Sequence, residues 1–255
     1  MYNQGNPFGG IGGGPFSRRP AGAFGGSRFQ YQTVPTYEGA QAASGLIAKV
    51  MTLLAFSFLF AFFGTVVGYF TVLSLGTYWI VAIAGLVVLF ILNFAIQAQG
   101  WNLFLLYLFT FLEGMGLAPI VRIYLATAPD ILSEAFLITA ITSLALAVYA
   151  WTTKHDFTRL ADYLFFGLIL LIITSIVGIF FGGIFHTTLF GLIISLIGIA
   201  IFSGYVLVYV QRAKYMADTL PNAIGLTVSI FITVLNLFLY ILQLLSILQG
   251  GNRRR

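Results

Sequence analysis

The chain has 255 residues, of which 60% are hydrophobic and only 7% are charged, and several separate apolar runs each exceed the ~18 residues that a membrane span needs. This balance excludes an ordinary soluble domain, and the absence of cysteine excludes disulfides, thiolate metal sites and a cysteine nucleophile. The net charge of +5 comes largely from the two ends, so it indicates membrane topology and not a nucleic-acid-binding surface.

Residues 1–44 form a Gly-rich tail that carries three arginines and has no acidic residue before Glu38. The tail lacks the apolar core of a signal peptide, and its glycines argue against an amphipathic transit helix. Such a composition is typical of a segment that cannot build a core of its own. We therefore expect any order in this tail to come from a partner, such as a larger membrane protein complex.

Residues 45–249 are expected to form one all-α transmembrane domain of seven helices, followed by a short basic segment at residues 250–255. The connections are short, so consecutive helices should be antiparallel neighbours. The expected helices lie near Leu46–Phe70, Trp79–Gln97, Asn102–Leu125, Leu132–Trp151, Asp162–Phe181, Thr188–Gln211 and Asn222–Leu248.

The distribution of lysine and arginine predicts the orientation of this bundle. With the amino terminus inside, eight basic residues collect on the inner side: Arg18, Arg19, Arg28, Lys49, Lys154, Arg159, Arg212 and Lys214. Four lie on the other side: Arg122, Arg253, Arg254 and Arg255. The terminal triplet opposes this assignment, so a re-entrant last segment with both ends inside stays open. We expect a bacterial inner membrane or an organellar membrane, mitochondrial inner or endoplasmic reticulum.

Glycine pairs at GxxxG spacing occur in two of the expected helices. Gly64 and Gly68 lie in the first, and Gly178 and Gly182 lie at the end of the fifth. This spacing allows two helix backbones to approach closely, although it is also common by chance in Gly-rich membrane segments.

Glu113 lies near the middle of the third expected helix. A carboxylate at such a depth costs about 2.5–3.5 kcal/mol on insertion scales, so it needs a partner, solvation or a proton. Glu113 is thus a candidate ion or proton site, and the alternative is a neutral acid that is hydrogen-bonded within the bundle. Arg122 and Glu134 flank the next short connection, where we expect them to form a structural ion pair.

The last expected helix carries a polar stripe whose members recur three and four residues apart: Ser229, Thr233, Asn236, Tyr240 and Gln243. The sixth carries a stripe of small and aromatic residues at the same spacing: Ser195, Gly198, Phe202, Tyr205, Tyr209 and Arg212. In lipid, polar side chains face other helices, so the two stripes are expected to meet. Two interpretations of these stripes stay open: a polar interior of the bundle, or simple packing of small residues between helices.

The sequence offers little support for catalysis. His155 and His186 both fall in or beside connections, and neither an HExxH nor a GxSxG motif occurs. The last helix has no lysine that could form a Schiff base with retinal. We therefore expect no enzymatic activity, no cofactor, no metal site and no nucleic-acid partner.

Four groups of short motifs follow one another along residues 45–249: Phe111–Gly114 with Leu117–Pro119, Ala150–Asp156 with Leu164–Leu168, Phe202–Leu207 with Gln211 and Arg212, and Leu235–Leu239 with Leu242–Leu245. On these motifs the chain resembles the Bax inhibitor-1 family, also called TMBIM, whose members carry a TTKRD segment where this chain has Thr-Thr-Lys-His-Asp. The resemblance implies a seven-helix fold with the last helix at its centre. It also implies a role in calcium leak, in stress or cell-death suppression, or in the modulation of membrane proteases.

The resemblance also shows a departure from the family pattern. Family members commonly carry one aspartate in the sixth helix and one in the seventh, and these acids form a proton-sensing pair that closes a pore. The matching positions here are Tyr209 and Thr233. The remaining candidates for a polar interior are Glu113, Tyr209, Thr233 and Asn236. Two hypotheses follow: an ion-leak or stress-modulating family member, or a non-catalytic accessory subunit of a larger membrane complex.

Overall fold

The computed structural model describes residues 36–72, 74–180 and 187–252 of the chain. Within these residues the secondary structure is entirely helical: α1 Thr36–Thr71, α2 Leu75–Ala95, α3 Trp101–Thr127, α4 Pro129–Thr152, α5 Leu160–Phe180, α6 Thr188–Ala213 and α7 Leu220–Asn252. All seven expected helices are confirmed, and α1 begins at Thr36, earlier than the expected Leu46. Most of the tail, together with Gly182, His186 and the terminal arginines, lies outside the described residues.

All seven helices are long and apolar enough to cross a membrane, with spans of 19 residues in α5 to 30 residues in α7. Large hydrophobic side chains such as Phe62, Phe70, Phe90 and Ile141 are exposed on the outside of the bundle. A soluble domain could not leave such a surface in water, whereas lipid covers it without cost. The chain is therefore an integral membrane protein.

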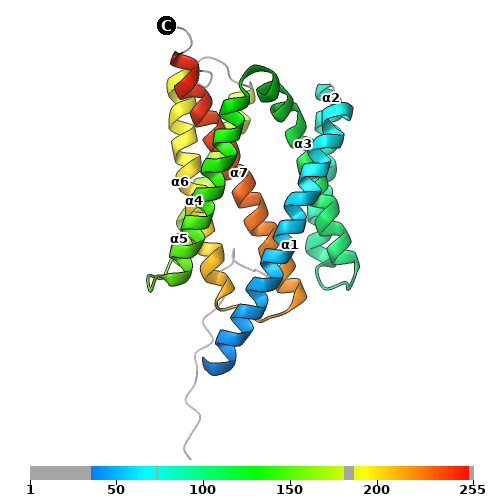
Figure 1. Cartoon of the computed structure of the whole chain (residues 1–255), viewed down its shortest axis with the longest axis vertical. Helices are drawn as coiled ribbons and strands as arrows, with labels where there is room; N and C mark the ends of the chain where they lie inside the picture. The colour runs from blue at the N-terminus through cyan, green and yellow to red at the C-terminus, as the bar shows by residue number, and fades with distance from the viewer. Residues whose placement is uncertain (1–35, 73, 181–186, 253–255) are drawn as a thin grey trace, which may run out of the picture.

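The helices alternate in direction, so that the connections gather at the two ends of the bundle (Figure 1). The start of α1 and the connections α2–α3, α4–α5 and α6–α7 lie at one end, the lower end in Figure 1. The end of α7 lies at the opposite end. This confirms that the start of α1 and the connection that contains Lys154 share one side. Because α7 is one continuous helix, the alternative of a re-entrant last segment is wrong.

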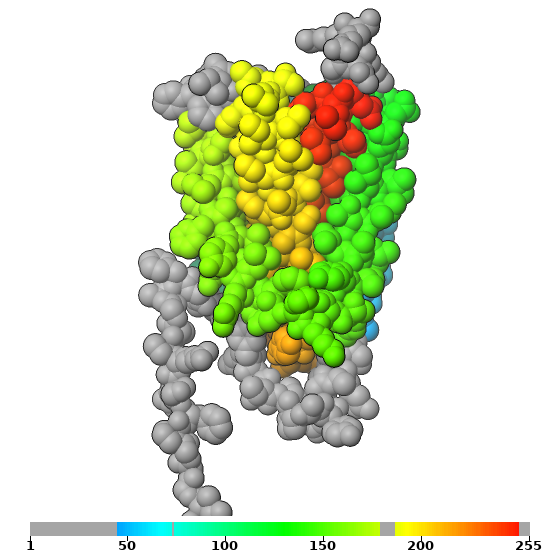
Figure 2. All heavy atoms as spheres, turned by 90° about the vertical axis from the view of Figure 1, so that its left-hand side faces the viewer, coloured from blue at the N-terminus to red at the C-terminus, as the bar shows by residue number. Residues whose placement is uncertain are grey.

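α7 crosses the bundle and joins two hydrophobic cores. Ile224 and Phe231, in its first half, pack in a core with side chains of α1, α2 and α3. Leu237 and Leu242, in its second half, pack in another core with side chains of α4, α5 and α6. Figure 2 shows the face on which α6 lies between α5 and α4, with the last turns of α7 between α6 and α4. The expected central position of the last helix is therefore confirmed.

α1 and α3 approach each other so closely that their backbones touch. A methyl group on Gly64 would overlap the carbonyl group of Phe111, and one on Gly114 would overlap the carbonyl group of Ala61. Thr65 closes the contact, because its hydroxyl donates to the Gly114 carbonyl at 2.9 Å. The GxxxG spacing in α1 thus has the role that such motifs play in membrane helix pairs.

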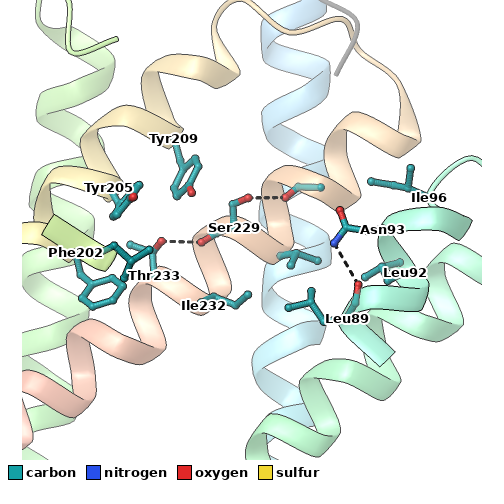
Figure 3. Close-up of a pocket in the computed structure, with 13 residues that line it drawn as sticks. Leu89, Leu92, Asn93, Ile96, Phe202, Tyr205, Tyr209, Ser229, Ile232 and Thr233 are labelled. Atoms are coloured by element: carbon teal, nitrogen blue, oxygen red, sulfur yellow. Dashed lines mark hydrogen bonds between the residues drawn. The ribbon is translucent and has the colours of Figure 1, made fainter. Parts of the chain in front are cut away.

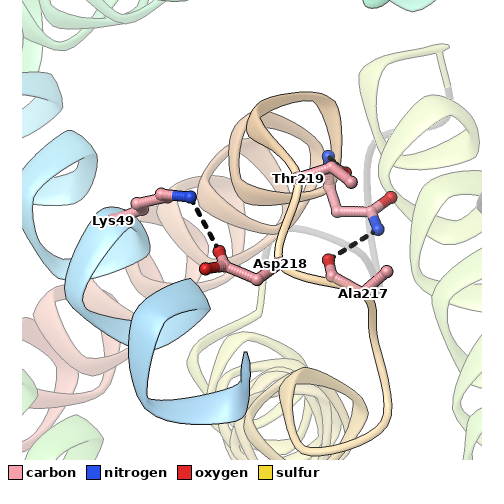
Figure 4. Close-up of polar contacts among 5 residues, drawn as sticks. Lys49, Ala217, Asp218 and Thr219 are labelled. Carbon is pink, nitrogen blue, oxygen red and sulfur yellow. Dashed lines mark hydrogen bonds and ion pairs between the residues drawn. The ribbon is translucent and has the colours of Figure 1, made fainter. Parts of the chain in front are cut away.

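An ion pair connects the start of α1 to the α6–α7 connection at the lower end (Figure 4). The Lys49 Nζ atom lies 2.9 Å from an Asp218 carboxylate oxygen, and Gly45 on α1 leaves room for that carboxylate. The Asn222 side-chain amide, in the first turn of α7, donates to the Ala217 carbonyl of the same connection at 2.9 Å. These contacts fix the turn from which α7 enters the bundle.

Candidate functional site: a cavity among α2, α5, α6 and α7

A cavity of about 280 Å³ lies in the half of the bundle that is nearer to the start of α1 (Figure 3). α2 lines it along residues 89–96, and α7 lines it along residues 225–233. α6 contributes Phe202, Tyr205 and Tyr209, and α5 contributes Leu168. None of the described residues that line the cavity carries a charge.

The α6 wall of the cavity is an aromatic ladder, made of Phe202, Tyr205 and Tyr209. These residues are three and four positions apart, so the helical period places them on one face. The rings of Tyr205 and Tyr209 stack with their centroids 5.5 Å apart and an interplanar angle of 15°. The Arg212 guanidinium continues the ladder towards the end of α6, 5.6 Å from the centre of the Tyr209 ring. A cation over an aromatic face is held by the ring quadrupole.

The polar side chains on the α7 wall bond to their own helix. The Ser229 hydroxyl donates to the Gly225 carbonyl at 2.9 Å, and the Thr233 hydroxyl donates to the Ser229 carbonyl at 2.7 Å (Figure 3). The Asn236 amide donates in the same way to the Ile232 carbonyl at 2.8 Å. The hydroxyl hydrogens of Ser229 and Thr233 and one amide hydrogen of Asn236 are therefore satisfied within α7, and Ser229 also forms a hydrogen bond with the Tyr209 side chain of α6.

Further along α7, the polar stripe does meet the stripe of α6, as expected. The Tyr240 ring lies directly against Gly198 and stacks on Phe202 with centroids 5.7 Å apart. Ser195, the next small residue of the stripe, is fully buried and donates to the Gly191 carbonyl at 2.6 Å. Small residues of one helix thus receive aromatic residues of the other.

The four residues proposed for a polar interior lie in different places. Tyr209 and Thr233 both line the cavity, whereas Asn236 lies on α7 outside the lining. Glu113 is not in the lining either: its carboxylate faces α2, 3.5 Å from where a methyl group on Gly85 would lie. Within the described residues no hydrogen-bond partner approaches the Glu113 carboxylate. The structure therefore does not unite Glu113 with the α6–α7 pair.

The expected ion pair between Arg122 and Glu134 is not formed. Arg122 instead donates to the Tyr69 carbonyl near the end of α1 and lies 5.0 Å from the centre of the Tyr69 ring. The last carbonyls of a helix have no partner within it and carry partial negative charge, so they attract a guanidinium. Glu134 accepts a hydrogen bond from the Gln249 amide at 2.7 Å. Among the described residues, Lys49 and Asp218 form the one ion pair.

The sequence did not reveal a clamp that holds the α4–α5 connection, residues 153–159, against the end of α6. The Gln211 side chain is 8% exposed and accepts a hydrogen bond from the Phe157 N–H at 2.7 Å, while its amide donates to the His155 carbonyl. Lys214 adds a bond to the Ala150 carbonyl at 2.9 Å. The motif Ala150–Asp156 and the motif that contains Gln211, on both of which the family resemblance rests, are therefore in contact. The signal available in the sequence was a glutamine near the end of an apolar helix.

Asp156 orders the outer side of this connection. Its carboxylate accepts hydrogen bonds from the Thr158 hydroxyl and from the Thr158 N–H, the latter at 2.8 Å. These bonds, together with the positive charge of Arg159, hold the pKa of the Asp156 carboxyl below its usual range. The connection is thus a short, structured loop with charged side chains on its surface.

A comparison with known families matches residues 43–250 to the family described as inhibitor of apoptosis-promoting Bax1. A protein of Helicobacter pylori is 31% identical over 216 residues, which cover 82% of this chain and 91% of the relative. A membrane protein of Vibrio cholerae is 32% identical over 57% of this chain and 64% of its own length. The Golgi anti-apoptotic protein of vaccinia virus is 30% identical over 57% of this chain and 58% of its own length.

Proposed function

This chain belongs to the Bax inhibitor-1 family, and we propose that it modulates stress responses or membrane proteases through contacts with other membrane proteins, without an acid-gated calcium leak. The observation that carries the proposal is the cavity among α2, α5, α6 and α7, whose described lining carries no charge. Tyr209 and Thr233 line it at the two positions where the resemblance places the proton-sensing acids.

The physical reason is the titration of the groups at these positions. Two carboxylates that are held close together in a low-dielectric site repel each other, so one of them binds a proton near physiological pH. A phenol and an aliphatic hydroxyl are both uncharged between about pH 5 and 8. The Tyr209 and Thr233 side chains therefore cannot sense acidity in this range. They also lack the negative charge that attracts Ca²⁺.

Action on other proteins is supported by the comparisons and by the sequence. One relative is named for an anti-apoptotic activity, and it matches a little more than half of this chain. The proposal includes a non-enzymatic mechanism, because the sequence offers neither a nucleophile with a base nor a catalytic metal motif.

Calcium flux into liposomes tests the proposal directly. We expect the reconstituted protein to show no calcium flux that switches between about pH 5 and 8, because the described cavity has no titratable acid in that range. The double variant Tyr209→Asp/Thr233→Asp places the family acids in the same cavity and should gain a pH response. A steep acid-dependent flux in the unmodified protein that Glu113→Gln abolishes would refute the proposal and make Glu113 the sensor.

A second candidate function is that of an accessory subunit in a larger membrane complex. The composition of residues 1–44 favours it, since a Gly-rich segment with several arginines gains order chiefly by binding. Purification from native membranes separates the two candidates. A stable complex of defined composition that dissolves when residues 1–35 are removed supports the accessory role, and a chain that purifies alone contradicts it.

A further inference from the structure

We propose that the cavity binds the hydrocarbon chain of an anionic amphiphile, whose charged head group lies beside Arg212. The cavity leads from the outside of the bundle to its interior. Asn93, on the α2 side, is exposed, whereas Thr233, on the α7 side, is 3% exposed. A molecule can therefore enter from the bilayer without unfolding any helix.

The packing of the helices explains why the cavity faces lipid. α2 packs mainly against α3, and α5 packs mainly against α6, so these two helices leave a gap between them among the described elements. Their cavity-lining residues Leu89, Ile96 and Leu168 are only half-buried. A cavity with this opening is in contact with acyl chains, and its largely apolar lining suits a hydrocarbon chain better than water.

Charge selects the head group. Arg212 lies one turn beyond Tyr209, near the end of α6, and has no carboxylate partner among the described residues. The neighbouring charged groups are engaged elsewhere: Lys214 bonds to the Ala150 carbonyl, and Asp218 pairs with Lys49. A basic residue beside a pocket between membrane helices, at the expected cytoplasmic end of the bundle, is a typical binding site for an anionic head group.

Tyr205 provides a polar contact inside the cavity. Its side chain is 8% exposed and lines the cavity, and its hydroxyl has no hydrogen-bond partner among the described residues. A donor that borders a largely apolar cavity gains a hydrogen bond when a ligand oxygen enters that cavity. The carboxylate of a fatty acid, or an ester oxygen of a phospholipid, would accept this hydrogen bond from the Tyr205 hydroxyl. The same lining contains no carboxylate, so a metal cation is a poor alternative occupant.

Photocrosslinking in liposomes tests the proposal. Two probes with a diazirine in the acyl chain, a fatty acid and a phosphatidylglycerol, distinguish a free anionic amphiphile from a membrane lipid. A phosphatidylcholine with the same chain is the probe without net charge. We expect mass spectrometry to place the crosslinks of at least one anionic probe on cavity-lining residues such as Leu92, Val228 and Ile232.

Three variants and one control examine the cavity and the charge separately. Ser229→Phe fills the cavity, and Asn93→Trp obstructs its exposed mouth, where the fold tolerates a large side chain. Either variant should abolish crosslinking at the cavity. Arg212→Gln should reduce crosslinking of the anionic probes about fivefold while leaving that of phosphatidylcholine unchanged. Arg159→Gln removes a cation from the same end of the bundle but away from the cavity, and it should change nothing.

Crosslinks that are spread over the lipid-facing helices, with no enrichment in the cavity, would overturn the proposal. So would equal labelling by all three probes, or an Arg159→Gln effect as large as that of Arg212→Gln. None of these outcomes depends on calcium flux. The amphiphile site can therefore fail while the proposed function stands, and the reverse also holds.

Discussion

Gln211 shows how one side chain can hold two segments of the chain together. Its amide oxygen and nitrogen both bond to backbone groups of residues 153–159, which have no regular structure to satisfy them. An apolar residue of similar size would leave an N–H and a carbonyl without partners in a half-buried site. The contact is between backbone and side chain, so the sequence of the connection itself gives no hint of it.

At this scale we predict that Gln211→Leu destabilises the protein by about 1–3 kcal/mol, the cost of stranded buried polar groups. Thermal unfolding in detergent measures the loss, and amide hydrogen exchange at Phe157 should accelerate. Gln97→Leu changes an exposed glutamine at the same end of the bundle and should be neutral. Equal stability of the Gln211 and Gln97 variants would show that the clamp does not stabilise the fold.

The contact between α1 and α3 shows what small residues do for a pair of membrane helices. Lipid does not drive helices together as water does, so association depends on close packing and on hydrogen bonds between helices. Gly64 and Gly114 let the two backbones meet, and the Thr65 hydroxyl bonds across the contact. On the other side of α3, Glu113 faces Gly85 of α2. α3 thus presents its glycine to one neighbour and its acid to another.

At the scale of elements we predict that Gly114→Ala separates α1 from α3 and costs about 1–3 kcal/mol, the usual range for an overpacked core. Gly116→Ala is the matched control, because the space beside Gly116 is open and alanine is the better helix former. Unfolding of the two variants in mixed detergent micelles measures the difference. A Gly114→Ala variant as stable as Gly116→Ala would contradict the close contact.

The sequence predicted the elements well and their side-chain partners poorly. Span length and apolar composition suffice to place seven helices, because lipid forces every backbone group to bond within its own helix. Partners across helices depend on tertiary geometry, which no local pattern encodes. Arg122 was expected to bond to Glu134 and instead bonds to α1. Tyr209 and Thr233 line one cavity, whereas Glu113, chosen for its depth alone, lies on a different interface.

The whole molecule is organised by α7, which passes through both hydrophobic cores. The first core contains side chains of α1, α2 and α3, and the second contains side chains of α4, α5 and α6. The connections at the two ends differ in charge, and the lower end carries Lys154, Arg159 and Lys214. Positively charged connections stay in the cytoplasm during insertion, which orients the bundle.

At this scale we predict that the lower end in Figure 1 is the cytoplasmic side. The chain has no cysteine, so single substitutions can be labelled without background. Gln97→Cys and Thr158→Cys should react with a membrane-impermeant maleimide only in inverted vesicles, and Thr127→Cys only in right-side-out vesicles. Labelling of Thr127→Cys and Thr158→Cys from the same face would be incompatible with the observed arrangement of the helices.

The path of α7 also bears on biosynthesis. α7 leaves the ribosome after the other six helices, yet it supplies side chains at the centre of both cores. The earlier helices therefore enter the membrane as two incomplete groups, which must wait for the last span before either can close. During that interval the side chains that later pack beside α7, Tyr209 among them, are open to lipid. A chain that ended before residue 220 would lack α7, and neither of its hydrophobic cores would be complete.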